Sequence, residues 1–303
     1  MRLMTTNRGM ARLFARWRAR PLRHSRAVWA LLIVLDLLPW PWGEDIAAGL
    51  FMIAGLARPG RRRAALTWAE ATGAAQRWRR AAEACAFLEH WLAQTQALGF
   101  RSPEHFRQTL AIEGAAQLDS PGAAILLGFH LGPIGGDLPF RVLGYPVTFL
   151  GSTDRAATVG WWSGAWQPFL APSVLSLPVA SPDRWPAVLY RVRRMLLDGE
   201  KVYLLAEGDG TEVFRLPLSV GEWPIRAGWV TLHRLTGARV LPVFQHLDRR
   251  RHVLTIHPPL PPLNPDSPSD LEGWRDRLTC LVEDYIRRFP EQCPHLALMH
   301  PLR

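Results

Sequence analysis

Four short apolar runs recur along this 303-residue chain, with helix-like segments between them. A run of four to eight apolar residues stopped by turn residues is typical of a buried strand. Strands that alternate with helices favour a mostly parallel sheet covered on both faces. We therefore predict an α/β fold with a mostly parallel central sheet flanked by helices. The runs are Ala123 to Leu127, Val147 to Leu150, Val202 to Leu205 and Val240 to Phe244, and Val253 to Ile256 is a further candidate.

Helical spacing of apolar residues appears in four segments, and glycine follows two of them. Asp198-Gly199 ends the first of these two segments and Gly237 ends the second, as expected for helix stop signals. Residues 258–268 are rich in proline and predict a connector before the last helix. The predicted helical segments are residues 61–98, 185–197, 226–236 and 271–289.

The composition is that of a globular protein, with 48% apolar and 20% charged residues. The three cysteines, Cys85, Cys280 and Cys293, lie far apart and lack metal-ligand spacing. This pattern favours a reducing compartment over a disulfide framework or a zinc site. We assign the cysteines no chemistry.

The net charge of +10 is concentrated at the N-terminus, because residues 1–26 hold eight arginines, no lysine and no acid. Two apolar stretches follow, Ala27 to Leu38 and Ile46 to Ala57, with Pro-Trp-Pro-Trp between them. Each has about a dozen residues, whereas a membrane-spanning helix needs about 20. Arginines beside Trp-flanked apolar helices are typical of segments that lie in an anionic leaflet. We predict a membrane-associated helical segment over residues 1–60 and an α/β domain over residues 61–303.

Two other interpretations of the N-terminus remain. A signal peptide is one, although no A-x-A-like cleavage site follows the first apolar stretch. An organelle transit peptide is the other, since the arm is rich in arginine and free of acids.

A glycine-rich loop after the run that ends at Leu127 carries one histidine and one carboxylate, His130 and Asp137. Loops after buried strands are where α/β folds display reactive side chains. We predict His130 as a catalytic base with Asp137 as its orienting acid, and backbone N–H groups of residues 132–136 as candidate oxyanion donors. The structural alternative is a histidine at a strand end that is hydrogen-bonded to the backbone.

A second loop follows the run Val202 to Leu205 and carries Glu207, Asp209 and Glu212 among glycines. These carboxylates can orient the His130 imidazole, bind a substrate hydroxyl or hold a divalent ion. A solvated acidic turn is the alternative. No Walker-type phosphate loop and no Gly-x-Ser-x-Gly nucleophile motif occurs in the chain.

The order of these pieces resembles the lipid A biosynthesis (late) acyltransferase family, within the wider glycerolipid acyltransferase superfamily. The resemblance covers most of the chain. It includes the basic and apolar N-terminus, the strand that ends in a histidine, and three further segments. These segments are residues 196–210, residues 227–244 and the tail Phe289-Pro-Glu-Gln292.

The chain departs from the family at its most diagnostic motif, where the histidine is followed by four residues and then an acid. Position 135 is glycine here, and the first acid is Asp137. A two-residue insertion explains this spacing, because Gly144 follows Asp137 by the seven residues usual in the family. The other explanation is that the pair is broken, as in a divergent enzyme or a noncatalytic relative.

The resemblance implies transfer of a fatty acyl group to a hydroxyl of a membrane lipid acceptor. A lipid A precursor, a lysophospholipid and an aminolipid are the alternatives for this acceptor. The donor would be a thioester of acyl carrier protein or coenzyme A, with no cofactor and no metal. It implies substrate-binding roles for Arg155 and for the loop Glu207, Gly208 and Asp209, and Arg155 or Arg226 is suited to an acceptor phosphate. The implied location is the cytoplasmic face of the inner membrane, as a peripheral or monotopic protein.

Two other classes of function are weighed against this one. A noncatalytic lipid-binding relative would keep the fold without a working base, so a contact between His130 and a carboxylate is the feature that separates the two. A nucleic-acid binder is suggested by the basic charge and 14 tryptophans. It is disfavoured because the charge lies in one arm beside an apolar stretch.

Overall fold

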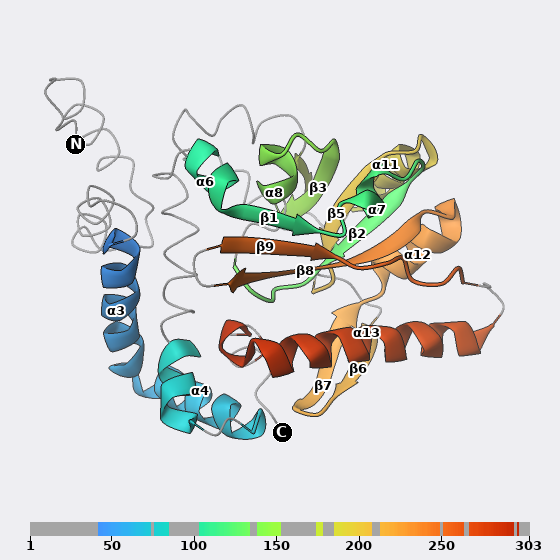
Figure 1. Ribbon diagram of the computed structural model, residues 1–303. Helices are drawn as coiled ribbons and strands as arrows, with labels where there is room; N and C mark the ends of the chain where they lie inside the picture. Colours follow the sequence, from blue (N-terminus) through green and yellow to red (C-terminus); the bar gives the residue numbers. More distant parts are fainter. Residues whose placement is uncertain are drawn as a thin grey trace, which may run out of the picture.

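The computed structural model has a seven-stranded sheet at its centre, with strand order β1-β9-β8-β2-β5-β3-β4 (Figure 1). The structure describes residues 42–73, 76–84, 103–133, 138–152, 174–177, 185–207, 213–248, 251–263, 267–293 and 296. The strands of the sheet are β1 (Leu110–Glu113), β2 (Ala124–Gly128), β3 (Val147–Ser152), β4 (Val174–Leu177), β5 (Lys201–Leu205), β8 (Arg239–Asp248) and β9 (Arg251–Ile256).

Five neighbouring strands of the sheet, β8, β2, β5, β3 and β4, run parallel. The strand β9 is antiparallel to β8, and β1 pairs parallel with β9. The prediction of a mostly parallel sheet in an α/β fold is therefore confirmed. All five residues of β2 are buried, as expected for the central strand of a sheet that is covered on both faces.

Helices cover both faces of the sheet (Figure 1). On one face, alternate residues of β2 and β5 pack against α11, α12, α13 and Trp68 of α4, while Leu118 of α7 and Phe140 of α8 cover the other face. The helices are α3 (Trp42–Leu56), α4 (Pro59–Ala71), α6 (Pro103–Thr109), α7 (Ala116–Asp119), α8 (Leu138–Val142), α11 (Trp185–Leu197), α12 (Gly228–Thr236) and α13 (Pro268–Arg288), and the 3₁₀ helix η2 spans Pro290–Gln292.

A β-hairpin lies between β5 and α12 and was not expected from the sequence. Its strands β6 (Val213–Leu218) and β7 (Gly221–Arg226) pair antiparallel, and Leu216, Trp223 and Ile225 bury their side chains in the core. The predicted helix over residues 226–236 is wrong at its start, because Arg226 is the last residue of β7 and α12 begins at Gly228. The hairpin buries the apolar residues before Arg226, so the extended chain continues to that residue.

The N-terminal region is described only in part. Residues 1–41, which include the arginine-rich arm and the first apolar stretch, lie outside the described residues. The second apolar stretch lies within α3 except for its last residue, Ala57. Helix α3 packs through Leu56 against α4 and the helical residues 77–84. No helix in the described part of the chain is both long enough and apolar enough to cross a membrane.

Candidate functional site

His130 and Glu207 occupy equivalent positions on neighbouring parallel strands. The register pairs Gly128, the last residue of β2, with Leu205, the last residue of β5. Each functional residue follows its strand by two positions, so both emerge from the same edge and the same face of the sheet. This edge is where ligands bind in open α/β sheets.

The Glu207 carboxylate makes two hydrogen bonds to His130. Oε1 accepts from the backbone N–H of His130 at 2.9 Å, and Oε2 lies 3.3 Å from the ring atom Nδ1. The side chain of Glu207 is 8% exposed and that of His130 is 29% exposed. The carboxylate is thus shielded from water, while part of the imidazole remains accessible to a substrate.

The irregular end of the β2–β5 ladder explains why the carboxylate reaches the backbone of His130. The Ala206 N–H donates to the Gly128 carbonyl at 2.8 Å, and in a regular parallel ladder the His130 N–H would donate next to the Ala206 carbonyl. That carbonyl instead accepts from the backbone N–H of Arg226 at 2.8 Å. The Glu207 side chain therefore takes the place of the missing acceptor, which ties the acid to the histidine.

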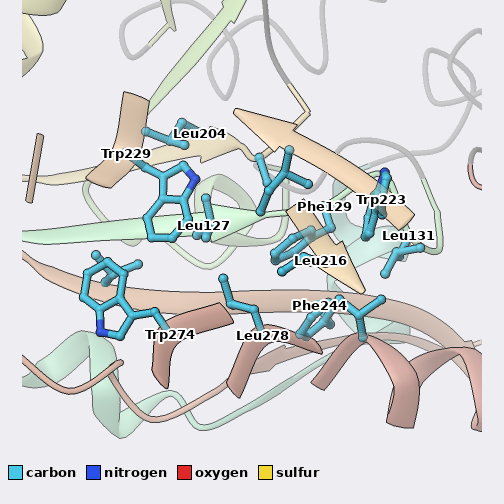
Figure 2. Packing of buried hydrophobic residues seen from close by; sticks show 14 of the residues in the cluster. Leu127, Phe129, Leu131, Leu204, Leu216, Trp223, Trp229, Phe244, Trp274 and Leu278 are labelled. Carbon is cyan, nitrogen blue, oxygen red and sulfur yellow. The ribbon is translucent and has the colours of Figure 1, made fainter. Parts of the chain in front are cut away.

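The two neighbours of His130 hold it in place from the opposite face of the sheet. Phe129 stacks on Phe244 at a centroid distance of 4.9 Å, and its ring lies 5.7 Å from that of Trp223. Leu131 is completely buried and belongs to the same core as Trp223 (Figure 2). With residues 129 and 131 anchored in this core, His130 faces the other way, toward Glu207.

Arg226, the last residue of β7, lies next to the His130–Glu207 pair through its backbone. Its backbone bond to Ala206 places it beside the loop that begins at Glu207, and its side chain is partly exposed. Three of the predicted site residues therefore come together at this edge. The other four, Asp137, Arg155, Gly208 and Asp209, lie outside the described residues and remain predictions.

Two glycines of the histidine loop have structural explanations. A side chain at Gly128 would meet the hydroxyl of Tyr203, since a Cβ there would lie 2.0 Å from that oxygen. Gly132 has a φ of +73°, and a Cβ there would lie 1.9 Å from the Gln245 carbonyl oxygen. The chain on either side of His130 thus lies close to the Tyr203 side chain of β5 and to the backbone of β8.

The expectation that Gly132 is an oxyanion donor is wrong. Its N–H donates to the backbone carbonyl of Gln292 at 2.8 Å, so it is not available to a substrate. Pro133 has no N–H, and residues 134–136 lie outside the described residues. Gln292 itself was not among the predicted site residues, because its link to this loop depends on the packing of the C-terminal segment.

Neither metal ligands nor reactive thiols are found at this edge in the described part of the chain. No three His, Cys, Asp or Glu side chains there are grouped closely enough to hold a metal ion. Cys280 and Cys293 are free thiols, and burial raises the pKa of Cys293 well above its ordinary value, so it stays protonated at neutral pH. The functional groups that meet at the site in the described residues are the imidazole of His130 and the carboxylate of Glu207, and the backbone of Arg226 lies beside them.

Comparison with known proteins gives a likeness to solved structures only. No protein-family model and no curated protein matches the chain. Among solved structures, the chain is similar to the crystal structure of the 1-acyl-sn-glycerophosphate (LPA) acyltransferase PlsC from Thermotoga maritima. The two share 15% sequence identity over 69% of this chain and 83% of that chain, with a TM-score of 0.38. Because this score is low, we base the functional proposal on the geometry of His130 and Glu207.

Proposed function

We propose that the protein is an acyltransferase that moves a fatty acyl group from a thioester to a hydroxyl of a membrane lipid. The observation that carries this proposal is the shielded carboxylate of Glu207 against Nδ1 of a partly exposed His130. A noncatalytic lipid-binding relative does not require a histidine that is oriented by a shielded carboxylate. The resemblance of the sequence to the lipid A acyltransferases supplies the reaction class.

His130 acts as the general base. A carboxylate that accepts from Nδ1–H leaves Nε2 with its lone pair, so Nε2 can take a proton from the acceptor hydroxyl. The hydroxyl oxygen attacks the thioester carbonyl as it loses this proton. The departing thiolate then takes the proton from the imidazolium, which regenerates the neutral base. Proton transfer of this kind contributes roughly 10²- to 10⁴-fold to a rate.

Glu207 holds the tautomer and stabilises the imidazolium that forms during the reaction. Its distance of 3.3 Å from Nδ1 is longer than the best charge-assisted bond, as is common in sites without substrate. Asp137 remains the second candidate carboxylate, as the spacing of the sequence motif predicts. Asp137 and Glu207 are thus the two candidates for the acid that orients His130.

Substrate recognition is proposed for the residues around this pair. The guanidinium groups of Arg226 and Arg155 suit an acceptor phosphate, because each offers forked donors. Gly208 and Asp209 continue the loop that begins at Glu207, where they can contact the acceptor. The donor is a thioester of acyl carrier protein or coenzyme A, and no cofactor or metal takes part in these steps.

The proposed location is the cytoplasmic face of the inner membrane, as a peripheral or monotopic protein. Four large apolar side chains on α3, Trp42, Ile46, Leu50 and Ile53, are exposed at helical spacing. The exposed arginines 58, 62 and 63 follow the end of this helix. An apolar stripe next to arginines is the combination that binds the surface of an anionic bilayer.

The test is acyl transfer by membranes that contain the wild-type protein or His130→Ala. Donors are offered as both carrier-protein and coenzyme A thioesters, and the lipids are analysed by mass spectrometry. We expect a newly acylated lipid in the wild type and its loss in His130→Ala, with both proteins folded and bound to membranes. Absence of any acylated lipid in the wild type with both donors would favour the noncatalytic relative.

A further inference from the structure

The C-terminal motif Pro290-Glu291-Gln292 forms the 3₁₀ helix η2, which we call the strap. The proposed chemistry gives this motif no role, although each of its three residues bonds to a different part of the molecule. These bonds connect the loop of His130 to helix α4.

On one side, the strap holds the catalytic loop against β8. The side-chain amide of Gln292 accepts from the N–H of Leu247 at 2.8 Å and donates to the carbonyl of the same residue at 2.9 Å. The backbone carbonyl of Gln292 accepts from the Gly132 N–H at 2.8 Å. Gln292 is 5% exposed, so these bonds are shielded from water. Gly132 follows His130 by two residues, so this bond places the strap next to the base.

On the other side, the strap is bonded to the N-terminal helices. The indole N–H of Trp68 in α4 donates to the carbonyl of Pro290 at 2.7 Å. The guanidinium of Arg80 lies 2.9 Å from the carboxylate of Glu291, in a pair that is only partly exposed. Trp68 is itself buried in the main core. The strap therefore connects α4 and the helix that contains Arg80 to the catalytic loop through three consecutive residues.

We propose that the strap is the positioning element of the catalytic loop: Gln292 holds Gly132 in place, and Trp68 couples the strap to α4. Its effect on the rate rests on the proposed function, but its effect on the position of His130 does not. The contact between His130 and Glu207 is long at 3.3 Å, so a small shift of the loop changes it. Gln292 is thus a positioning residue, because it acts on His130 through Gly132.

The chain provides a matched control for Trp68. Trp274 in α13 is also buried, belongs to the same core and donates its indole N–H to a proline carbonyl, that of Pro261, at 2.7 Å. Trp68→Phe and Trp274→Phe therefore remove the same kind of hydrogen bond and a similar volume from one core. They differ in that only Trp68 bonds to the strap.

The experiment measures how fast diethyl pyrocarbonate modifies His130 in full-length protein bound to anionic vesicles. Peptide mass spectrometry follows His130, and an added histidine-containing peptide is the internal reference. His233 is unsuitable as a reference because its ring packs on Trp274, with ring centroids 4.9 Å apart, and the control variant would change it. In Trp68→Phe we expect the rate at His130 to rise about fivefold, which corresponds to the loss of one ordinary hydrogen bond. Gln292→Met, which removes both side-chain bonds to Leu247, should give at least this increase.

Acyl-transfer kinetics on the same proteins provide a second readout. We expect kcat to fall about fivefold in Trp68→Phe while the KM for the thioester stays within about twofold, since the proposed role of the strap is to position His130 and not to bind the donor. Trp274→Phe should lose similar thermal stability but keep the wild-type kcat and the wild-type labelling of His130.

Equal labelling of His130 in Trp68→Phe, Trp274→Phe and wild type would overturn the coupling. If the wild type has no acyl-transfer activity, the proposed function fails, and the labelling rates still decide whether the strap positions the loop. A change in labelling without a change in kcat would overturn the role of the strap in catalysis.

Discussion

At the scale of single residues, Glu207 contacts both the backbone and the imidazole of His130. Its carboxylate replaces the backbone acceptor that β5 does not offer to His130, and the same group reaches Nδ1. The histidine is therefore oriented by an acid from the neighbouring strand. The sequence places the two residues 77 positions apart, so their pairing follows from the parallel register of β2 and β5.

Gly128 gives a prediction about packing under the site. A Cβ at this position would lie 2.0 Å from the hydroxyl oxygen and 2.4 Å from Cζ of Tyr203. We expect Gly128→Ala to lower the free energy of unfolding by about 1–3 kcal/mol, the usual cost of overpacking a core. Urea-induced unfolding measures this change.

The control for this prediction is the double variant Gly128→Ala with Tyr203→Leu. The shorter leucine side chain leaves room for the added methyl group. The free energy of unfolding lost in the double variant should therefore be smaller than the sum of the losses in Gly128→Ala and Tyr203→Leu alone. Strict additivity would show that the clash with Tyr203 is not the cause.

At the scale of elements, α3 presents the surface on which membrane attachment depends. Ile53 is 64% exposed and continues the stripe that begins at Trp42. We expect Ile53→Glu to weaken binding to anionic vesicles about tenfold or more, because a carboxylate replaces a side chain whose burial stabilises the bound state. Vesicle co-sedimentation measures the binding.

Leu235→Glu is the matched control for this surface. Leu235 is 53% exposed on α12, a helix separate from the α3 stripe. Its replacement should leave vesicle binding unchanged. Equal losses in the two variants would indicate that negative charge alone, rather than the α3 stripe, decides the binding.

Periodicity predicts the longer elements of this fold better than the short ones. Helices α11 and α13 and the core strands β2, β5 and β8 were expected within a few residues of their observed ends, because each is a long periodic segment or a continuous apolar run. The strands β1 and β4 have four residues each and were missed. The hairpin was missed because Pro217 and Pro224 argue against a strand, whereas a two-stranded ribbon has only edge strands and tolerates proline.

At the scale of the whole molecule, the buried His246 and the half-buried His257 make the free energy of unfolding depend on pH. Burial is the main cause that lowers the pKa of both His246 and His257, and the guanidinium groups of Arg288 and Arg277 add to it. Glu113, Asp248 and Asp284 oppose this effect. The folded protein therefore binds these protons at lower pH than the unfolded chain does.

The sign of the effect follows from this difference. Below the ordinary histidine pKa of about 6.5, the unfolded state takes up protons that the folded state does not, so the stability from these groups is lost as the pH falls. We expect the free energy of unfolding to fall less between pH 7.5 and pH 5.5 in His246→Gln than in the wild type. Urea titrations at the two pH values measure the difference, and an equal fall in both proteins would contradict it.

The sequence predicts which residues form the candidate site, but it does not predict the contacts between them. His130, Glu207 and Arg226 were identified from strand ends and residue types, and the structure brings them to one edge. The bond from Gly132 to Gln292 depends on how the last helix returns across β8, which no local pattern specifies. Because the N–H of Gly132 is used in this bond, Gly132 does not serve as an oxyanion donor.

The measurement that tests the central claim most directly is the single-turnover rate of lipid acylation by Glu207→Gln. Glu200→Gln is the control, because Glu200 is exposed and lies at the opposite end of β5. Asp137→Asn is measured beside them, so that the contributions of the two candidate acids are separated. We predict that Glu207→Gln folds normally and loses roughly 10²- to 10⁴-fold in rate, because an amide at Nδ1 favours the tautomer that cannot accept the proton. A rate equal to that of Glu200→Gln would contradict the account.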